Sequence, residues 1–107
     1  MQTPPKIFKQ LKIIETLYQQ GNIDTAIEQS IDKIISQELE NAHHSQAELI
    51  ADIQQFENQY QMSSAEFYQR LHSGELGDDL DFVEWNAFYE MKKSLDRRID
   101  LLESSTK

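Results

Sequence analysis

The residues from Asp24 to Met62 form a run of thirty-nine residues that contains neither glycine nor proline. Because these two residues most often interrupt a helix, the run predicts one long helix. At 1.5 Å per residue it would be about 58 Å long, which exceeds the width of a domain of this size. Such a helix needs packing partners along its length, from its own chain or from a second copy.

A coiled-coil seam follows the second part of this run. From position 35 onward, apolar residues recur with the 3.5-residue period of heptad core positions. One core position is polar, and a polar core residue fixes the register of helix pairing. We therefore predict a dimer through this seam, with an intramolecular bundle as the alternative. The seam consists of Ile35, Leu39, Ala42, Gln46, Leu49, Ile53, Phe56 and Tyr60, and Gln46 is the polar member.

The rest of the chain also has helical patterns. Four isoleucines at positions 23, 27, 31 and 34 precede the seam in a different phase, which predicts a bend or a change of packing partner near Ile35. Ser63–Glu66 has the sequence of a capping box. We predict an all-α fold in a single helical domain over residues 1–107, a bundle or hairpin built on the long helix. The first helix should pack on the start of the long helix, and the last helix along its second half. The predicted helices cover residues 5–20, 24–62, 64–73 and 80–103.

Composition excludes several classes of function. The net charge of −9 repels a nucleic-acid backbone over most of the surface and favours a basic protein partner. The chain has no cysteine, which rules out disulfides and thiolate chemistry. It also lacks an apolar run long enough to span a bilayer. We therefore expect a cytoplasmic protein that does not contact a membrane.

The strongest concentration of charge lies between residues 75 and 90, which include six acidic residues and no basic one. Helix capping and complementation of the helix dipole explain part of this cluster, and a surface for a basic partner explains the rest. The spacing does not match a calcium-binding loop. Aromatic residues next to the cluster belong either to the core or to an anchor for another protein. The candidate partner-binding residues are Glu75, Asp78, Asp79, Asp81, Glu84, Trp85 and Tyr89.

No pattern indicates an enzyme. The row Glu40, His44 and Glu48 could contribute metal ligands from one helix face, but the Glu-x-x-His pairs of di-iron bundles are missing. A solvated pairing of these side chains is the simpler interpretation. Neither a nucleophile–base pair nor a glycine-rich phosphate loop is present. We therefore predict no catalytic residues, no metal and no cofactor.

Two segments carry a family resemblance. The first is Tyr60–Tyr68 (YQMSSAEFY), and the second is Gly74–Trp85 (GELGDDLDFVEW). Together with the long helix they resemble a group of small helical bacterial and cyanobacterial proteins, over about residues 24–102. Members of this group look like antitoxins encoded beside small toxin genes, often of the ribonuclease type. The resemblance implies a non-enzymatic protein that binds and neutralises a cognate toxin.

Three hypotheses about function therefore follow from the sequence. The first is an antitoxin-like protein, whose acidic surface would cover a basic toxin. The second is a structural homodimeric coiled-coil adaptor without a toxin. The third is a DNA-binding transcriptional regulator, for which the only basic surfaces are Lys6/Lys9/Lys12 and Lys92/Lys93/Arg97/Arg98.

Overall fold

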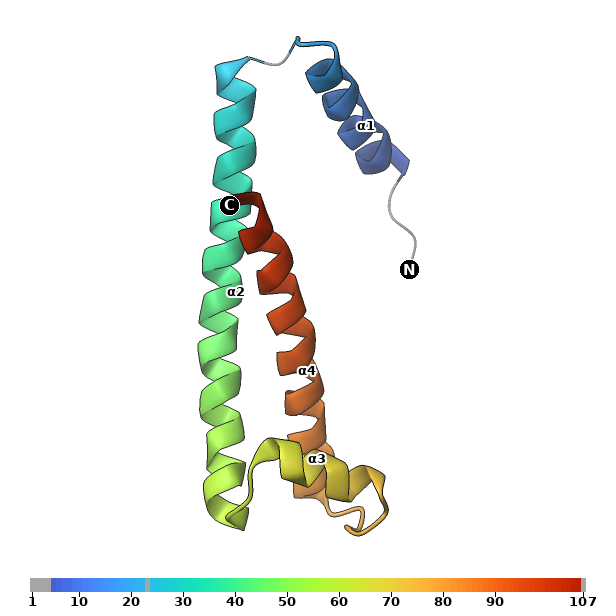
Figure 1. The fold of residues 1–107 in the computed structure, drawn as a ribbon, viewed down its shortest axis with the longest axis vertical. Coiled ribbons are helices and arrows are strands. Elements are labelled where there is room, and N and C mark those ends of the chain that lie inside the picture. Colours follow the sequence, from blue (N-terminus) through green and yellow to red (C-terminus); the bar gives the residue numbers. More distant parts are fainter. Residues whose placement is uncertain (1–4, 23, 107) are drawn as a thin grey trace. The chain divides into compact units, whose positions relative to one another are not determined.

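A computed structural model describes residues 5–22 and 24–106 of the chain. It contains four α-helices and a short 3-10 helix: α1 (Pro5–Gln19), α2 (Thr25–Tyr60), α3 (Ser64–His72), α4 (Leu80–Glu103) and η1 (Ser104–Thr106) (Figure 1). The described residues contain no strand. The predicted all-α fold is therefore confirmed, while Ile23, which belonged to the predicted isoleucine row, lies outside the described residues.

The chain divides into two compact units, Met1–Ser36 and Gln37–Lys107. The division falls within α2, between Ser36 and Gln37, close to Ile35, where the sequence predicted a bend or a change of packing partner. The helix itself continues without interruption from Thr25 to Tyr60. The single domain predicted from the chain length stays a prediction.

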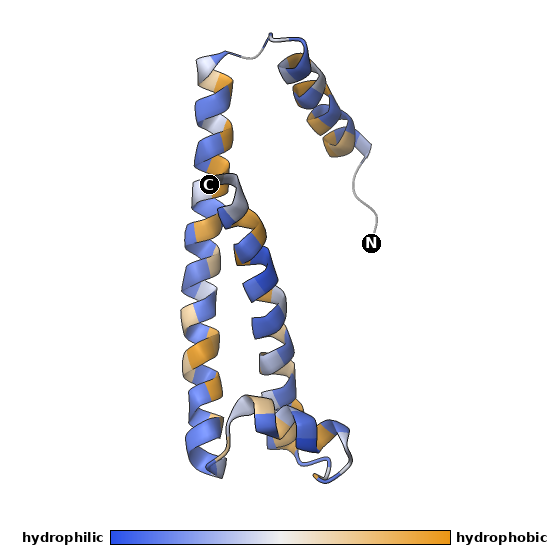
Figure 2. Ribbon diagram, viewed as in Figure 1, coloured by the Kyte–Doolittle hydropathy of each residue, from blue (hydrophilic) through white to orange (hydrophobic). Residues whose placement is uncertain are grey.

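The second unit is a helical hairpin. In it α4 runs back along the C-terminal part of α2, and α3 lies across the end where the chain turns (Figure 1). Hydrophobic residues recur along one side of these helices (Figure 2). The buried apolar side chains are Ala42, Leu49, Ile53, Phe67, Trp85 and Ile99. Three of them belong to the predicted seam, and the last helix therefore packs along the second half of the long helix, as predicted.

Left-handed residues end the first three helices. Gly21 and Gly74 have φ values of 75° and 84°, and Gln61 has a φ of 51°. After each of them a backbone N–H bonds back to a carbonyl five residues earlier, such as Met62 N to Glu57 O at 3.2 Å. These bonds are those of the Schellman motif, which prefers glycine at the left-handed position. The long helix was predicted to reach Met62 and ends at Tyr60 instead, because Gln61 leaves the helical conformation.

Side chains cap the N-terminal ends of α2, α3 and α4. Ser63 Oγ accepts a hydrogen bond from Glu66 N at 3.1 Å, and Asp79 Oδ1 accepts one from Asp81 N at 3.0 Å. At the start of α2, Ile27 N donates to Asp24 Oδ1 at 3.0 Å. The serine half of the predicted capping box is thus formed. Glu66 does not complete the box, because its carboxylate lies 3.3 Å from the Arg70 guanidinium.

The first unit packs more loosely. α1 contains no buried residue, although its apolar side chains repeat at helical spacing. The first turns of α2 also leave Ile31 and Ile34 exposed, at 38% and 60%. The prediction that the first helix packs on the start of the long helix is therefore wrong for this structure.

A candidate protein-binding surface

An aromatic cluster fixes the end of the hairpin that carries the acidic segment. The Trp85 ring is fully buried and stacks on Phe67, with ring centroids 3.9 Å apart and an interplanar angle of 3°. Phe56 and Tyr60 of α2 stack against the same indole at 5.6 and 5.8 Å. Three aromatic side chains from α2 and α3 therefore pack around the one tryptophan of α4.

Polar contacts connect this cluster to the start of α3. Trp85 Nε1 donates to Ser64 Oγ at 2.8 Å, and Ser64 N donates to Glu57 Oε2 at 2.8 Å. Ser64 is itself buried, so both of its polar groups need these partners. The indole, the serine and the glutamate thus tie α4, α3 and α2 together at the turn.

The buried position of Trp85 corrects one sequence prediction. A partner-binding anchor must reach the surface, whereas Trp85 has no exposed area. The alternative interpretation, that the tryptophan belongs to the core, is the one that the structure supports. Its apolar ring fills the space between three helices, and its one polar atom has a partner inside the chain.

Asp81 also has a structural role. Its Oδ2 accepts hydrogen bonds from the Tyr60 hydroxyl at 2.5 Å and from Gln59 Nε2 at 3.4 Å. The hydrogen bond to Asp81, together with partial desolvation and the negative charges of Asp81 and Asp79, raises the pKa of Tyr60 to about 12. Asp81 therefore joins the start of α4 to the end of α2, which leaves it less available to a partner than its acidic neighbours.

Four of the predicted acidic residues remain on the surface. Glu75, Asp78, Asp79 and Glu84 are all exposed. Glu75 lies 3.9 Å from Arg70, and Asp79 caps α4. Within the described part of the chain, Asp78 and Glu84 form no hydrogen bond or ion pair. Their carboxylates are therefore the ones that a basic partner could bind without breaking a contact of this chain.

An apolar groove, which Asp78 helps to line, lies between the end of α3, the following loop and the start of α4. It has a volume of about 510 Å³. Val83 is 57% exposed, and the neighbouring Leu80 is 77% exposed. The sequence did not predict this groove, because Leu71 and Leu76 reach it only through the turn at Gly74. The groove is lined by Leu71, Leu76, Gly77, Asp78, Phe82, Val83 and Asn86.

Tyr89, the remaining candidate, lies on another side of α4. Its ring centroid is 5.2 Å from that of Tyr68, and Lys93 Nζ lies 4.0 Å from the Tyr68 centroid and 5.2 Å from the Tyr89 centroid. Desolvation lowers the pKa of Lys93, but hydrogen bonding to Tyr68 and Glu90 outweighs it and the net shift is upward. The half-buried Tyr89 thus contributes to a cation–π cluster with Lys93.

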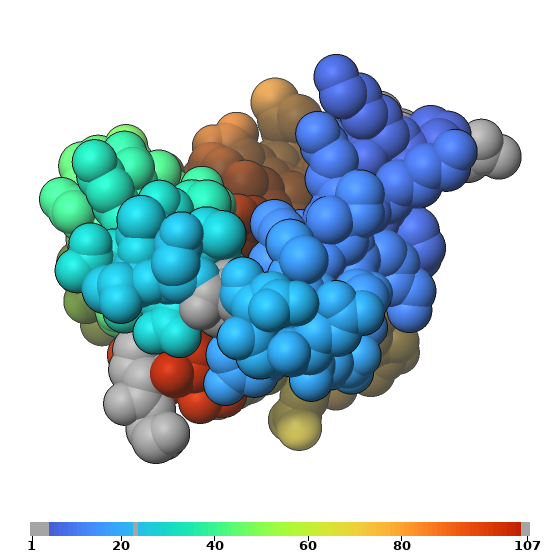
Figure 3. Space-filling model, turned by 90° about the horizontal axis from the view of Figure 1, so that it is seen from above, coloured from blue at the N-terminus to red at the C-terminus, as the bar shows by residue number. Residues whose placement is uncertain are grey.

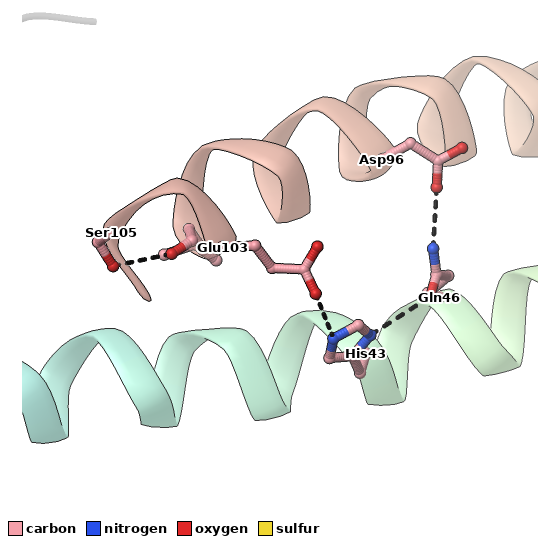
Figure 4. A network of polar contacts seen from close by, with 6 residues as sticks. His43, Gln46, Asp96, Glu103 and Ser105 are labelled. Carbon is pink, nitrogen blue, oxygen red and sulfur yellow. Dashed lines mark hydrogen bonds and ion pairs between the residues drawn. The ribbon is translucent and has the colours of Figure 1, made fainter. Parts of the chain in front are cut away.

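A polar network lies farther along the hairpin, at the middle of the predicted seam (Figure 4). Gln46 Nε2 donates to Asp96 Oδ1 at 3.0 Å, and Lys92 Nζ donates to Asp96 Oδ2 at 2.9 Å. These bonds lower the pKa of Asp96, and the bond from Lys92 has the largest effect. Next to them, His43 Nε2 lies 3.7 Å from Glu103 Oε2. Gln46, the polar residue of the seam, therefore pairs α2 with α4 of the same chain.

The residues considered for metal binding lie on the surface of α2. His44 lies 3.3 Å from Glu48 on an exposed helix face, as a solvated pairing requires. In the part of the chain that the structure describes, no group of histidine and acidic residues could hold a metal ion. Among the same residues, no helix is both long enough and apolar enough to cross a membrane.

Comparison of the sequence with models of known protein families, with curated proteins and with solved structures gives no match. The chemistry of the surface therefore has to be interpreted from the chain itself.

Proposed function

We propose that this chain is a non-enzymatic antitoxin-like protein that binds a cognate basic toxin, of the ribonuclease type that the family resemblance implies. The observation that carries the proposal is the pairing of exposed carboxylates with an apolar groove. Asp78 and Glu84 have no partner within the described residues, and Asp78 lines the groove together with Leu76 and Val83, the residue before Glu84.

Physical chemistry favours a basic protein as the occupant of this surface. Apolar side chains supply affinity when they are buried, and complementary charges steer encounter and select the partner. Ribonucleases bind a polyanion and therefore present cationic surfaces. A chain with a net charge of −9 attracts such a surface.

The DNA-binding alternative receives less support from the geometry. Its main basic surface consists of Lys92, Lys93, Arg97 and Arg98 on α4. Three of these four cations already pair with carboxylates: Lys92 with Asp96, Lys93 with Glu90 and Arg98 with Glu38. Neutralised cations release few counterions from DNA, so this surface offers little affinity for it.

Co-expression tests the proposal. The tagged chain is expressed with the product of its immediate genomic neighbour, and the complex is isolated and its stoichiometry measured. We expect a stable complex, together with recovery of growth when the neighbour is toxic. The double variant Asp78→Lys/Glu84→Lys should lose at least tenfold in affinity, because two favourable charge interactions become repulsive.

A matched control separates a local effect from one of net charge. Asp52→Lys/Asp100→Lys changes two other exposed carboxylates and raises the net charge by the same amount. It should bind as the native chain does. The proposal is refuted if the neighbour does not bind, and the proposed surface is refuted if both double variants bind equally well.

A further inference from the structure

The first turns of α2, which belong to the first unit, carry an apolar stripe of their own. Within the second unit, the contacts of α4 reach back to His43 and Glu38, where Arg98 Nη2 donates to Glu38 Oε2 at 2.6 Å. Before that point α2 has three more turns, which carry Ile27, Ile31 and Ile34 on one face. Ile34 is 60% exposed. This part of the helix therefore presents an apolar face within the first unit, on which Ile31 and Ile34 are exposed.

α1 has an even wider apolar face. At 100° per residue, its apolar side chains span an arc of about 220°, whereas contact with one neighbouring helix needs a stripe of about 100°. None of its described residues is buried, and five of the large side chains are at least half exposed. α1 thus has enough apolar surface for two neighbouring helices. Its apolar residues are Ile7, Phe8, Leu11, Ile13, Ile14, Leu17 and Tyr18.

The two helical segments carry opposite charges. Over residues 5–22 the charged side chains are Lys6, Lys9, Lys12 and Glu15, which give a net charge of +2. Over residues 24–36 they are Asp24, Glu28, Asp32 and Lys33, which give −2. A surface that contains both halves of a complementary pair can bind a second copy of itself about a two-fold axis. This complementarity identifies the occupant as another copy of this chain.

We infer that residues 5–36 are the dimerisation segment of this protein. Two copies bring together their α1 helices and the first turns of their α2 helices in a four-helix bundle. The basic α1 of one copy lies against the acidic start of α2 of the other. About ten apolar side chains per copy, burying roughly 80 Å² each, remove about 800 Å² per copy from water, which is the size of a standard stable interface.

This interface differs from the dimer predicted from the sequence. Most of the seam between Ile35 and Tyr60 is already occupied, because Gln46 bonds to Asp96 and the Phe56 and Tyr60 rings stack on Trp85. The N-terminal segment instead leaves its apolar residues exposed. Its surface is shown in blue to cyan in Figure 3. The inference does not depend on the proposed function, because it uses a different part of the chain.

The first test is the mass of the full chain in solution, measured by light scattering over a range of concentrations. We expect the mass of two chains for the native protein. The variant Leu11→Asp/Ile34→Asp should have the mass of one chain, because it places two charges in the apolar interface. Its Trp85 fluorescence should stay that of the native chain, since both residues are exposed and lie outside the hairpin.

The control variant is Met91→Asp/Leu101→Asp, which changes two apolar residues of α4 that are 53% and 72% exposed. It should keep the mass of two chains. A native chain that has the mass of one chain at all concentrations overturns the inference. A Leu11→Asp/Ile34→Asp variant that keeps the mass of two chains overturns it as well.

A charge exchange then tests whether α1 contacts the other copy. One variant carries Lys6→Glu and Lys9→Glu, and a second carries Glu28→Lys and Asp32→Lys. Each alone should dimerise at least tenfold more weakly than the native chain, because like charges then face each other. An equimolar mixture should restore a mixed dimer, which a tag on one chain retains. If the two variants do not form a mixed dimer, α1 does not contact the α2 helix of a second copy and the inference is overturned.

Discussion

Replacing Trp85 with alanine tests how much of the hairpin depends on one side chain. The indole is fully buried and stacks on three aromatic rings, and its Nε1 bonds to a buried serine. Truncating a buried tryptophan to alanine costs about 3–5 kcal/mol of unfolding free energy. At about 0.05–0.15 kcal/mol per residue, a unit of about 70 residues has a total stability of roughly 4–10 kcal/mol. The substitution should therefore remove about half of that stability or more.

The measurement is urea unfolding followed by far-ultraviolet circular dichroism, because the variant lacks its only tryptophan as a fluorescent probe. Trp85→Phe should cost less, about 1–2 kcal/mol, since a phenyl ring still packs on Phe67 but does not donate to Ser64. Tyr18→Ala is the control at a 64% exposed aromatic residue and should change stability by less than about 0.5 kcal/mol. A loss below about 1 kcal/mol for Trp85→Ala would refute the view that this cluster holds the hairpin together.

Two further predictions concern the turn between α2 and α4. Because the pKa of Tyr60 is raised from 10.0 to about 12, its contribution to stability is complete below pH 10 and is lost as the pH rises through 12. An absorbance titration at 295 nm should show a tyrosine phase near pH 12, and Tyr60→Phe should abolish that phase. The absence of a phase near pH 12 in the native chain would contradict the bond to Asp81. Gln61→Gly should raise the unfolding free energy by about 0.5–1 kcal/mol, because Gln61 has a φ of 51° and glycine adopts that conformation without a Cβ clash. An unchanged or lower urea midpoint for this variant would show that glycine at position 61 does not stabilise the turn.

Local signals in the sequence predicted most of the helical elements. Helical periodicity and the serine before α3 act over a few residues, and each was interpreted correctly from its neighbours. The left-handed conformation of Gln61 was not predicted, because a glutamine in that conformation has no sequence signature. Met91, an apolar residue of α4, is 53% exposed. The next residue, Lys92, is partly buried instead, and its amine pairs with Asp96.

The candidate surface was harder to predict, because it depends on contacts between distant residues. Charge density alone placed the acidic residues at one end of the hairpin. It could not separate Asp81, which bonds to Tyr60, from Asp78, which makes no such bond within the described chain. An aromatic residue beside an acidic segment can face inward or outward with the same local sequence. Only the packing of three helices decides that Trp85 is buried while Val83 lines a groove.

The uneven composition of the hairpin has a consequence for its folding dynamics. Around the turn, aromatic stacking and buried hydrogen bonds join three helices, whereas the far end buries the smaller side chains of Ala42 and Ile99 and adds exposed pairs such as Arg98 with Glu38. Exposed ion pairs contribute little free energy, so opening of the far end costs far less than opening at the turn. We expect amide hydrogen exchange to slow progressively from Ile99 toward Trp85 along α4. The hairpin then closes from the aromatic turn outward, so that the ends of its helices near Glu38 are the last to pair and the first to separate.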